Sequence, residues 1–227
     1  MIRELKERVL EANLALVKHG LALFTWGNAS EILRSEGLIA IKPSGIPYET
    51  MKADDIVVVD PDGHIVDGHR KPSSDTATHL VLYKAFPETG GVVHTHATYS
   101  TAWAQAGRDI PAVGTTHADY FADAIPCTRT MTQQEIEGAY EEETGHVIAE
   151  RFKHLNPAHI PGVLVAHHGP FSWGKDAADA VHNAVVMEQV ALMAAISYSL
   201  NPSLAMNPHL ITRHFFRKHG AQAYYGQ

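Results

Sequence analysis

Two histidines separated by one residue, His94 and His96, are the side chains of this sequence best suited to hold a metal ion. On a strand, residues i and i+2 leave the same face about 6.5 to 7 Å apart, so both imidazoles can converge on one ion. His168 follows a second apolar segment and precedes Gly169, whose missing side chain leaves room beside a ligand. Three neutral imidazoles favour zinc with one position open for water or substrate, and cobalt or manganese would also be accepted.

These histidines also have a less specific interpretation, which is packing or hydrogen bonding in a polar core. A single H-x-H pair supports both interpretations about equally, and the third histidine at a comparable strand end favours the metal site. His167 is the alternative to His168 as third ligand, and alternation along a strand would put the two on opposite faces. We therefore predict a metal site formed by His94, His96 and His168.

Three polar loops are candidates for binding the charged end of a substrate. Lys42–Gly45 ends an expected strand with a cation, a hydroxyl and a flexible backbone, while Ser73–Ser74 stands at an expected helix N-terminus, which favours anions. Gly27–Asn28 is the third loop. Each has a purely structural interpretation as a helix cap, a turn residue or a loop former. Because both common nucleotide-binding glycine patterns are absent, the sequence favours a small phosphorylated ligand over a nucleotide.

The composition excludes several classes of protein. Of the 227 residues, 45% are hydrophobic and 19% are charged, which is ordinary for a globular chain, and we expect residues 1–227 to form a single domain. A net charge of −7 argues against nucleic-acid binding. Cys127 is the single cysteine, the charged start lacks the apolar segment of a signal peptide, and Val190–Ile196 is far shorter than the roughly 20 residues that cross a bilayer. We expect a cytoplasmic protein without a membrane partner.

The hydrophobic pattern predicts an α/β fold with a mixed, largely antiparallel central sheet covered by helices. Helices are expected at residues 2–19, 75–86, 98–106, 133–152 and 176–200, with a helical tail that ends at Gly220. Strands are expected at residues 38–41, 56–59, 65–66, 92–95 and 163–166 and near Phe171, and an irregular stretch follows residue 106 as far as Tyr120.

Several motifs, taken together and in order, resemble the class II aldolase family. They extend from the first helix to the closing segment 218–227. The motifs are Thr25–Asn28, Lys42–Gly45, Lys71–Thr76, His94–His96, Gly114–Tyr120 and His168–Pro170.

The resemblance implies that His94, His96 and His168 coordinate the metal and that the carboxylate of Asp75 lies near or on the ion. It also implies a set of residues that bind the substrate and its phosphate. These are Gly27, Asn28, Lys42, Ser44, Gly45, Ser73 and Ser74.

The same resemblance matches Asp119 and Tyr225 to the acid/base pair of the family, and we include His214 as an assisting residue. By this likeness the tail that carries Tyr225 reaches a neighbouring subunit, and the assembly is a homotetramer with active sites at subunit interfaces. Without the family match, Asp119 could equally be a loop aspartate.

Within the family, the likeness favours a metal-dependent sugar-phosphate epimerase. A carbon that bears a hydroxyl and no acidic proton can be inverted by opening and re-forming a carbon–carbon bond, and a bound ion would stabilise the resulting enediolate. The nearest alternative is a sugar-phosphate aldolase, although related aldolases carry glutamate where this chain has Asp75. More distant alternatives are a zinc hydrolase and a metal-binding protein that is not an enzyme.

Overall fold

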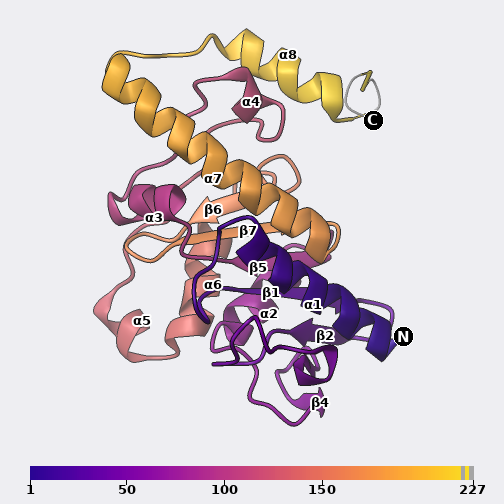
Figure 1. The fold of residues 1–227 in the computed structure, drawn as a ribbon. Coiled ribbons are helices and arrows are strands. Elements are labelled where there is room, and N and C mark those ends of the chain that lie inside the picture. The colour runs from indigo at the N-terminus through magenta and orange to yellow at the C-terminus, as the bar shows by residue number, and fades with distance from the viewer. Residues whose placement is uncertain (221–222, 225–227) are drawn as a thin grey trace.

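The computed structural model describes residues 1–220 and 223–224. Its centre is a sheet with helices on both faces (Figure 1), and among the described residues the strands lie in the order β4-β3-β2-β1-β5-β7-β6. The elements are, in chain order, α1 (Ile2–Lys18), β1 (Asn28–Leu33), β2 (Leu38–Ile41), the 3-10 helix η1 (Ala53–Asp55), β3 (Val57–Val59), β4 (Ile65–Asp67), α2 (Thr76–Ala85), β5 (Gly91–His94), α3 (Thr98–Gln105), α4 (Thr115–Ala118), α5 (Gln133–Glu137), α6 (Tyr140–Arg151), β6 (Gly162–Leu164), β7 (Pro170–Gly174), α7 (Ala177–Leu200) and α8 (Pro208–Lys218).

The strands alternate their side chains between two hydrophobic cores. On β5, Val92 belongs to the core beneath α2 and α6, and Val93 belongs to the core beneath α1 and α7. Val58 of β3 lies on the same face as Val93, while Val57 and Val59 lie on the other. Because successive side chains of a strand leave opposite faces, His94 lies on the face of Val92, towards α2 and α6.

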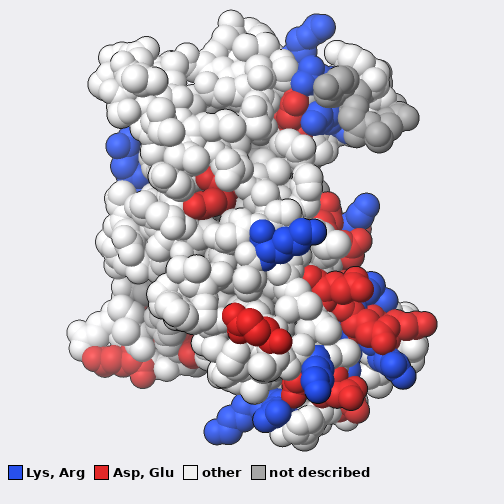
Figure 2. Space-filling model, in the orientation of Figure 1, with Lys and Arg blue, Asp and Glu red and all other residues white. Residues whose placement is uncertain are grey.

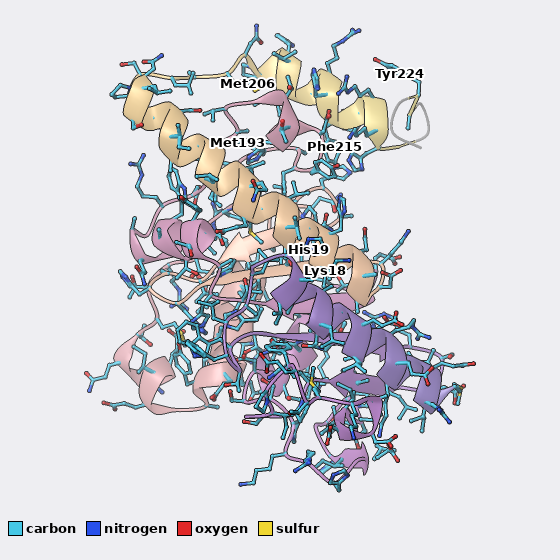
Figure 3. All side chains as sticks on the ribbon, viewed as in Figure 1. Lys18, His19, Met193, Met206, Phe215 and Tyr224 are labelled. Atoms are coloured by element: carbon cyan, nitrogen blue, oxygen red, sulfur yellow. The ribbon has the colours of Figure 1, made fainter. Side chains whose placement is uncertain are left out.

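One face of the sheet is covered by α1 and α7. The end of α1 at Lys18 and His19 lies beside α7 (Figure 3), and α7 packs on β5 and β7. Among the described residues, α7 is the helix that by length and composition could cross a membrane, but 56% of that apolar stretch is buried inside the subunit. Its apolar character is therefore that of a core helix.

The other face is covered by α2 and α6, which pack closely on each other. Gly145 makes this approach possible, because a Cβ atom there would lie 2.6 Å from the Cβ of Val81. A wider spacing would draw the start of α6 away from the end of β5. The close contact of the two helices therefore fixes where α6 begins relative to α2.

The chain after α7 turns back over the subunit as α8, which packs on α4 (Figure 1). Phe215 anchors this helix, since its side chain points into the subunit (Figure 3) and is 1% exposed. In the view of Figure 2, basic and acidic side chains gather near the end of α8, whereas the surface over the C-terminal half of α7 carries little charge.

The predicted α/β class and largely antiparallel sheet are confirmed. Each pair of neighbouring strands is antiparallel, and the parallel contribution is an isolated bridge between Cys127 and Leu164. The predicted first helix ends at Lys18, and Gly20 beyond it has a φ of +70°, as expected of a helix stop.

Four predictions of local structure were wrong. The helix expected at 133–152 is divided, because α5 ends at Glu137, with Gly138 as its C-cap, and α6 begins at Tyr140. Strand β1 was missed because Asn28 and Ser30 put polar groups where the pattern of a half-buried strand has apolar ones. The strand expected at 163–166 ends at Leu164, and the stretch predicted to be irregular contains the short helix α4.

Candidate metal centre and active site

His94 is the buried part of the candidate metal centre. It ends β5, lies opposite Asn28 of β1 and Phe171 of β7, and is 2% exposed. Its ring stacks on that of Phe171 with the centroids 4.3 Å apart, and its Nδ1 donates a 3.0 Å hydrogen bond to the carbonyl oxygen of Pro170. Because a carbonyl only accepts, Nδ1 carries the proton and Nε2 keeps a lone pair for a metal. Burial lowers the pKa of His94 to about 3, so the ring is neutral near pH 7.

The two other histidines converge on the same point. The Nε2 atoms of His94 and His96 are 3.1 Å apart, and the ligand atoms of His94, His96 and His168 all lie within 4.8 Å of one another. Two nitrogens that each bind one zinc ion at about 2.0 to 2.1 Å are separated by roughly 3.0 to 3.4 Å. The three side chains therefore fit one divalent ion, with donor atoms that suit zinc.

His168 reaches the site from a turn and not from a strand. Its neighbour His167 has a φ of +63° and is exposed, so His168 is the third histidine for a local reason other than strand alternation. Gly169 packs against the other two ligands as expected. A Cβ atom there would lie 2.9 Å from the carbonyl oxygen of Thr95 and 3.4 Å from the ring of His94.

The chain after His96 is fixed by a buried carboxylate on α7. Glu188 accepts hydrogen bonds from the backbone N–H groups of Tyr99 and Ser100, at 2.8 and 2.9 Å, and from the Ser100 hydroxyl at 2.7 Å. These groups form the first turn of α3, whose N–H groups have no partner within the helix. Glu188 thereby holds α3, and with it the end of the His94–His96 segment, against α7.

Asp75 lies on the wall of the same site, at the N-terminal boundary of α2. Its Oδ2 accepts a 2.6 Å hydrogen bond from the amide of Asn28. Burial by itself raises the pKa of Asp75, but the neighbouring His94 and His79 and the Asn28 bond hold it below its ordinary value. The carboxylate lines the pocket of the three histidines but is outside the group whose ligand atoms all lie within 4.8 Å.

The histidines open into a pocket of about 500 Å³. It contains the predicted ligands together with residues from the first loop and from the start of α6. Its lining residues are Trp26, Gly27, Ser74, Asp75, His94, His96, Tyr140, Glu141 and His168.

The three predicted polar loops lie beside one another. Pro43 and Pro72 form an antiparallel bridge, flanked by hydrogen bonds from Ser44 N–H to the carbonyl of Lys71 and from Ser73 N–H to the carbonyl of Lys42, both 2.9 Å. Asn28 joins the pair, because its amide also donates to the Ser73 hydroxyl at 3.0 Å. Its Oδ1 is buried and has no hydrogen-bond partner among the described residues.

Lys42 has a different position from the one expected of a free phosphate-binding cation. Its ammonium is buried, donates to the carbonyl of Thr25 at 3.1 Å and lies 4.8 Å from the centre of the Tyr48 ring. Burial lowers the pKa of Lys42 to about 8. In this structure Lys42 holds the loop that precedes Gly27.

Two side chains from the start of α6, Tyr140 and Glu141, complete the wall opposite this loop. The Tyr140 hydroxyl lies 3.4 Å from Nδ1 of His168, the ring atom that stays available when Nε2 binds a metal. The hydroxyl of Thr78 on α2 donates to the carbonyl of Glu141. Together with the Gly145 contact, this bond fixes where α6 begins.

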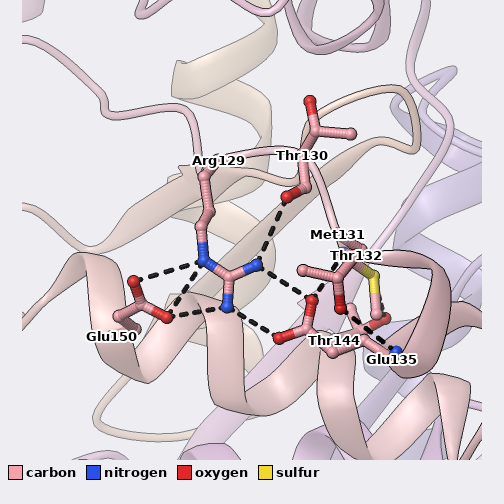
Figure 4. A network of polar contacts seen from close by, with 7 residues as sticks. All are labelled: Arg129, Thr130, Met131, Thr132, Glu135, Thr144 and Glu150. Atoms are coloured by element: carbon pink, nitrogen blue, oxygen red, sulfur yellow. Dashed lines mark hydrogen bonds and ion pairs between the residues drawn. The ribbon is translucent and has the colours of Figure 1, made fainter.

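The other end of the α5–α6 segment is held by an ion-pair network around Arg129 (Figure 4). The guanidinium contacts the carboxylates of Glu135 on α5 at 2.7 Å and Glu150 on α6 at 2.9 Å. Glu135 also forms a capping box with Thr132 at the start of α5. One cation thus joins both helices and orients the segment that carries Tyr140.

Asp119 and His214, predicted to act as acid/base residues, lie together but away from the histidine pocket. Nδ1 of His214 is 2.9 Å from the Asp119 carboxylate, Arg217 binds both of its oxygens at 3.1 and 2.8 Å, and Lys218 lies 3.5 Å away. Burial by itself raises the pKa of Asp119, but the bonds from Arg217 and His214 hold it below its ordinary value. Neither residue lines the pocket, and Tyr225 lies outside the described residues.

The family described as Class II Aldolase and Adducin N-terminal domain matches residues 7–195. The chain is 59% identical over all 227 residues to L-ribulose-5-phosphate 4-epimerase UlaF of Salmonella paratyphi B, with 100% of both chains covered. The chain belongs to the class II aldolase family. The same identity and coverage hold for the UlaF epimerase of Salmonella typhi.

Solved structures show the same class II aldolase fold. An L-fuculose 1-phosphate aldolase has a TM-score of 0.77 and 26% identity, over 92% of this chain and 95% of its own. The L-fuculose 1-phosphate aldolase from Glaciozyma antarctica PI12 has a TM-score of 0.78 at 17% identity, over 97% and 84%. The second likeness concerns the fold alone.

Sequence reasoning found the three histidines and Asp75 but missed three other pocket residues, Trp26, Tyr140 and Glu141. Trp26 belongs to the recognised motif Thr25–Asn28, but only its neighbours Gly27 and Asn28 were predicted to bind the substrate. Tyr140 and Glu141 belong to a helix start that the pattern placed inside a longer helix. A helix break predicted at Gly138 would have identified Tyr140 and Glu141 as residues at the start of a new helix. Helix N-termini often bind ligands.

Proposed function

We propose that this chain is an L-ribulose-5-phosphate 4-epimerase, which interconverts L-ribulose 5-phosphate and D-xylulose 5-phosphate. The observation that carries the proposal is the pocket in which His94, His96 and His168 converge and which Ser74 and Asp75 also line. The full-length similarity to curated epimerases supports the choice of substrate.

The reaction inverts C4, which bears a hydroxyl and no acidic proton. The C3–C4 bond therefore opens to give a two-carbon aldehyde phosphate, and re-forms on the other face of the aldehyde. A divalent ion, which we take to be zinc with cobalt or manganese as alternatives, would supply a Lewis acid for the substrate oxygens when bound by His94, His96, His168 and Asp75.

The polar loops would hold the phosphate of the substrate while the C3–C4 bond opens and re-forms. The amide of Asn28 and the hydroxyls of Ser44, Ser73 and Ser74 can donate to phosphate oxygens, and Gly27 and Gly45 allow the anion close to the backbone. The pairing of these loops across Pro43 and Pro72 supports this role, since it gathers the donors on one side of the pocket. A retained phosphate keeps the aldehyde fragment beside the histidines.

We further propose that Asp119 and Tyr225 move the protons, with His214 as their support, and that they act at the pocket of a neighbouring copy. Asp119 is not among the residues that line the histidine pocket of its own chain, which supports this arrangement. Exposed apolar residues on α7, Met193, Ile196 and Leu200, offer a surface for subunit contact. The assembly we propose is a homotetramer in the cytoplasm.

A sugar-phosphate aldolase is the second candidate, and the fold likeness to an L-fuculose 1-phosphate aldolase at 26% identity favours it. One experiment separates the two. The metal-loaded protein is incubated with L-ribulose 5-phosphate while D-xylulose 5-phosphate and free glycolaldehyde phosphate are both measured. Epimer without free aldehyde supports the epimerase, and stoichiometric free aldehyde without epimer overturns it.

A further inference from the structure

Two large aromatic side chains stand exposed on the loop between α1 and β1, beside the metal pocket. Phe24 is 73% exposed and Trp26 is 50% exposed, and their rings meet edge to face with the centroids 5.5 Å apart. The φ of Phe24 is +54°, in the left-handed region that bulky residues rarely adopt. Burial of these rings does not explain this conformation, because both face solvent.

The backbone under the two rings is firmly held. The carbonyl of Thr25 accepts from Lys42 at 3.1 Å, and the carbonyls of Trp26 and Gly27 accept from the Tyr48 hydroxyl at 2.8 and 3.0 Å. Lys42 and Tyr48 are both buried and contact each other. The carbonyl groups of Thr25, Trp26 and Gly27 are thus held by buried side chains. The loop that carries the exposed aromatic side chains is therefore rigid.

The same loop lies close to His94, at the end of β5. Gly27 has a φ of +73°, and a Cβ atom there would lie 2.9 Å from the carbonyl oxygen of His94. Trp26, which precedes Gly27, therefore lines the pocket. The centroid of its ring is 6.2 Å from that of the His96 ring. On the opposite wall are Tyr140 and the third ligand, His168.

We propose that Trp26, braced by Phe24, is a specificity-determining residue that retains the aldehyde fragment between opening and re-formation of the C3–C4 bond. This inference rests on the proposed epimerase function. The indole forms an apolar wall beside His96, while Asn28, one residue after Gly27, holds the phosphate end. On the His96 side of the pocket the indole would stand between the aldehyde and solvent, so the aldehyde could turn its other face to C3 before it leaves. The wall thus favours epimer over free aldehyde.

The test compares Trp26→Ala, Trp26→Phe and a control, Leu23→Ala, in the full-length metal-loaded protein. Leu23 belongs to the same loop and is 59% exposed, but it does not line the pocket. The first readout is the ratio of free glycolaldehyde phosphate to D-xylulose 5-phosphate. We expect Trp26→Ala to raise this ratio by about tenfold, the scale of one lost aromatic contact, Trp26→Phe to raise it less and Leu23→Ala not at all. An unchanged ratio in Trp26→Ala overturns the proposal.

A second readout does not depend on turnover. Calorimetry with 2-phosphoglycolate, a stable two-carbon phosphate, should show affinity weakened by about tenfold in Trp26→Ala and unchanged in Leu23→Ala. A wild-type protein that binds this probe but forms no epimer contradicts the proposed function alone, whereas equal affinity in Trp26→Ala and wild type contradicts the role of Trp26.

Metal content and molar mass complete the test. Both should be the same in all variants, because Trp26 is no ligand and the loop backbone is anchored by Lys42 and Tyr48. Loss of metal in Trp26→Ala would assign the residue to the metal centre, and dissociation into smaller species would assign the aromatic pair to a subunit contact. Either outcome overturns the proposal.

Discussion

The region around His94 and the region around Asp119 are built in opposite ways. At the first, imidazole rings are packed against Phe171 and Gly169, and their nitrogen atoms converge on one point. At the second, a carboxylate is held by Arg217 and other basic groups of α8, and it faces no pocket that contains the histidines. Among the described residues, a single chain therefore gathers the three candidate metal ligands at one point, whereas Asp119 lies outside the lining of their pocket.

The largest effect is expected from the first region. In His94→Asn or His168→Asn, the protein should lose its bound metal and all epimerase activity, because one of the three nitrogen ligands is gone. The fold should persist, since the sheet is held by the two hydrophobic cores. Elemental analysis, product assays and far-ultraviolet circular dichroism provide the measurements. A variant that retains stoichiometric metal would remove that histidine from the ligand set.

The second region should respond differently. We expect Asp119→Asn to keep the metal and to lose turnover by about 10² or more, the usual contribution of positioned proton transfer. Turnover number and metal content are measured on the same sample. Wild-type turnover in this variant would show that Asp119 acts only as the partner of α8.

The contact between α2 and α6 can be tested by stability. A methyl group in Gly145→Ala would clash with Val81, and overpacking of this kind costs about 1 to 3 kcal/mol of the free energy of unfolding. Gly114→Ala is the matched control, because no atom lies within 4 Å of its added Cβ. Urea unfolding of both variants gives the comparison. Equal destabilisation would mean that the close helix approach is not what Gly145 provides.

The smallest effect is expected from the bond between Tyr140 and His168. Its length of 3.4 Å is long for a hydrogen bond, so Tyr140→Phe should weaken metal affinity by about tenfold, the low end for residues that orient metal ligands. Competition with a chromophoric chelator measures this affinity. No change would show that His168 is oriented by the turn at Gly169 alone.

The sequence predicted the first region better than the second, for physical reasons. His94 and His96 were recognisable as an H-x-H pair, although the strand expected to carry both ends at His94, and His96 lies in the segment that follows. Gly169 was recognisable because a residue without a side chain leaves room beside the histidines. His168 was predicted to be the third histidine and lies with the other two, but the turn that positions it depends on the left-handed conformation of His167, which the pattern of residue types does not reveal.

The pattern of residue types could not predict contacts between segments that are distant in the chain. Nothing in the spacing of Tyr140 indicates that the packing of Gly145 on Val81 brings it to the metal pocket. Lys42 was expected to bind phosphate, yet tertiary packing turns its ammonium to the carbonyl of Thr25. In both cases the decisive partner comes from another element of the chain.

The central claim is that three histidines hold one ion on which the epimerisation depends. The most direct measurement is the metal content and the rate of D-xylulose 5-phosphate formation of His96→Ala beside the wild type, both after incubation with zinc. We expect one ion per chain and epimer formation in the wild type, and neither in the variant. A metal-free His96→Ala protein with full activity would contradict it.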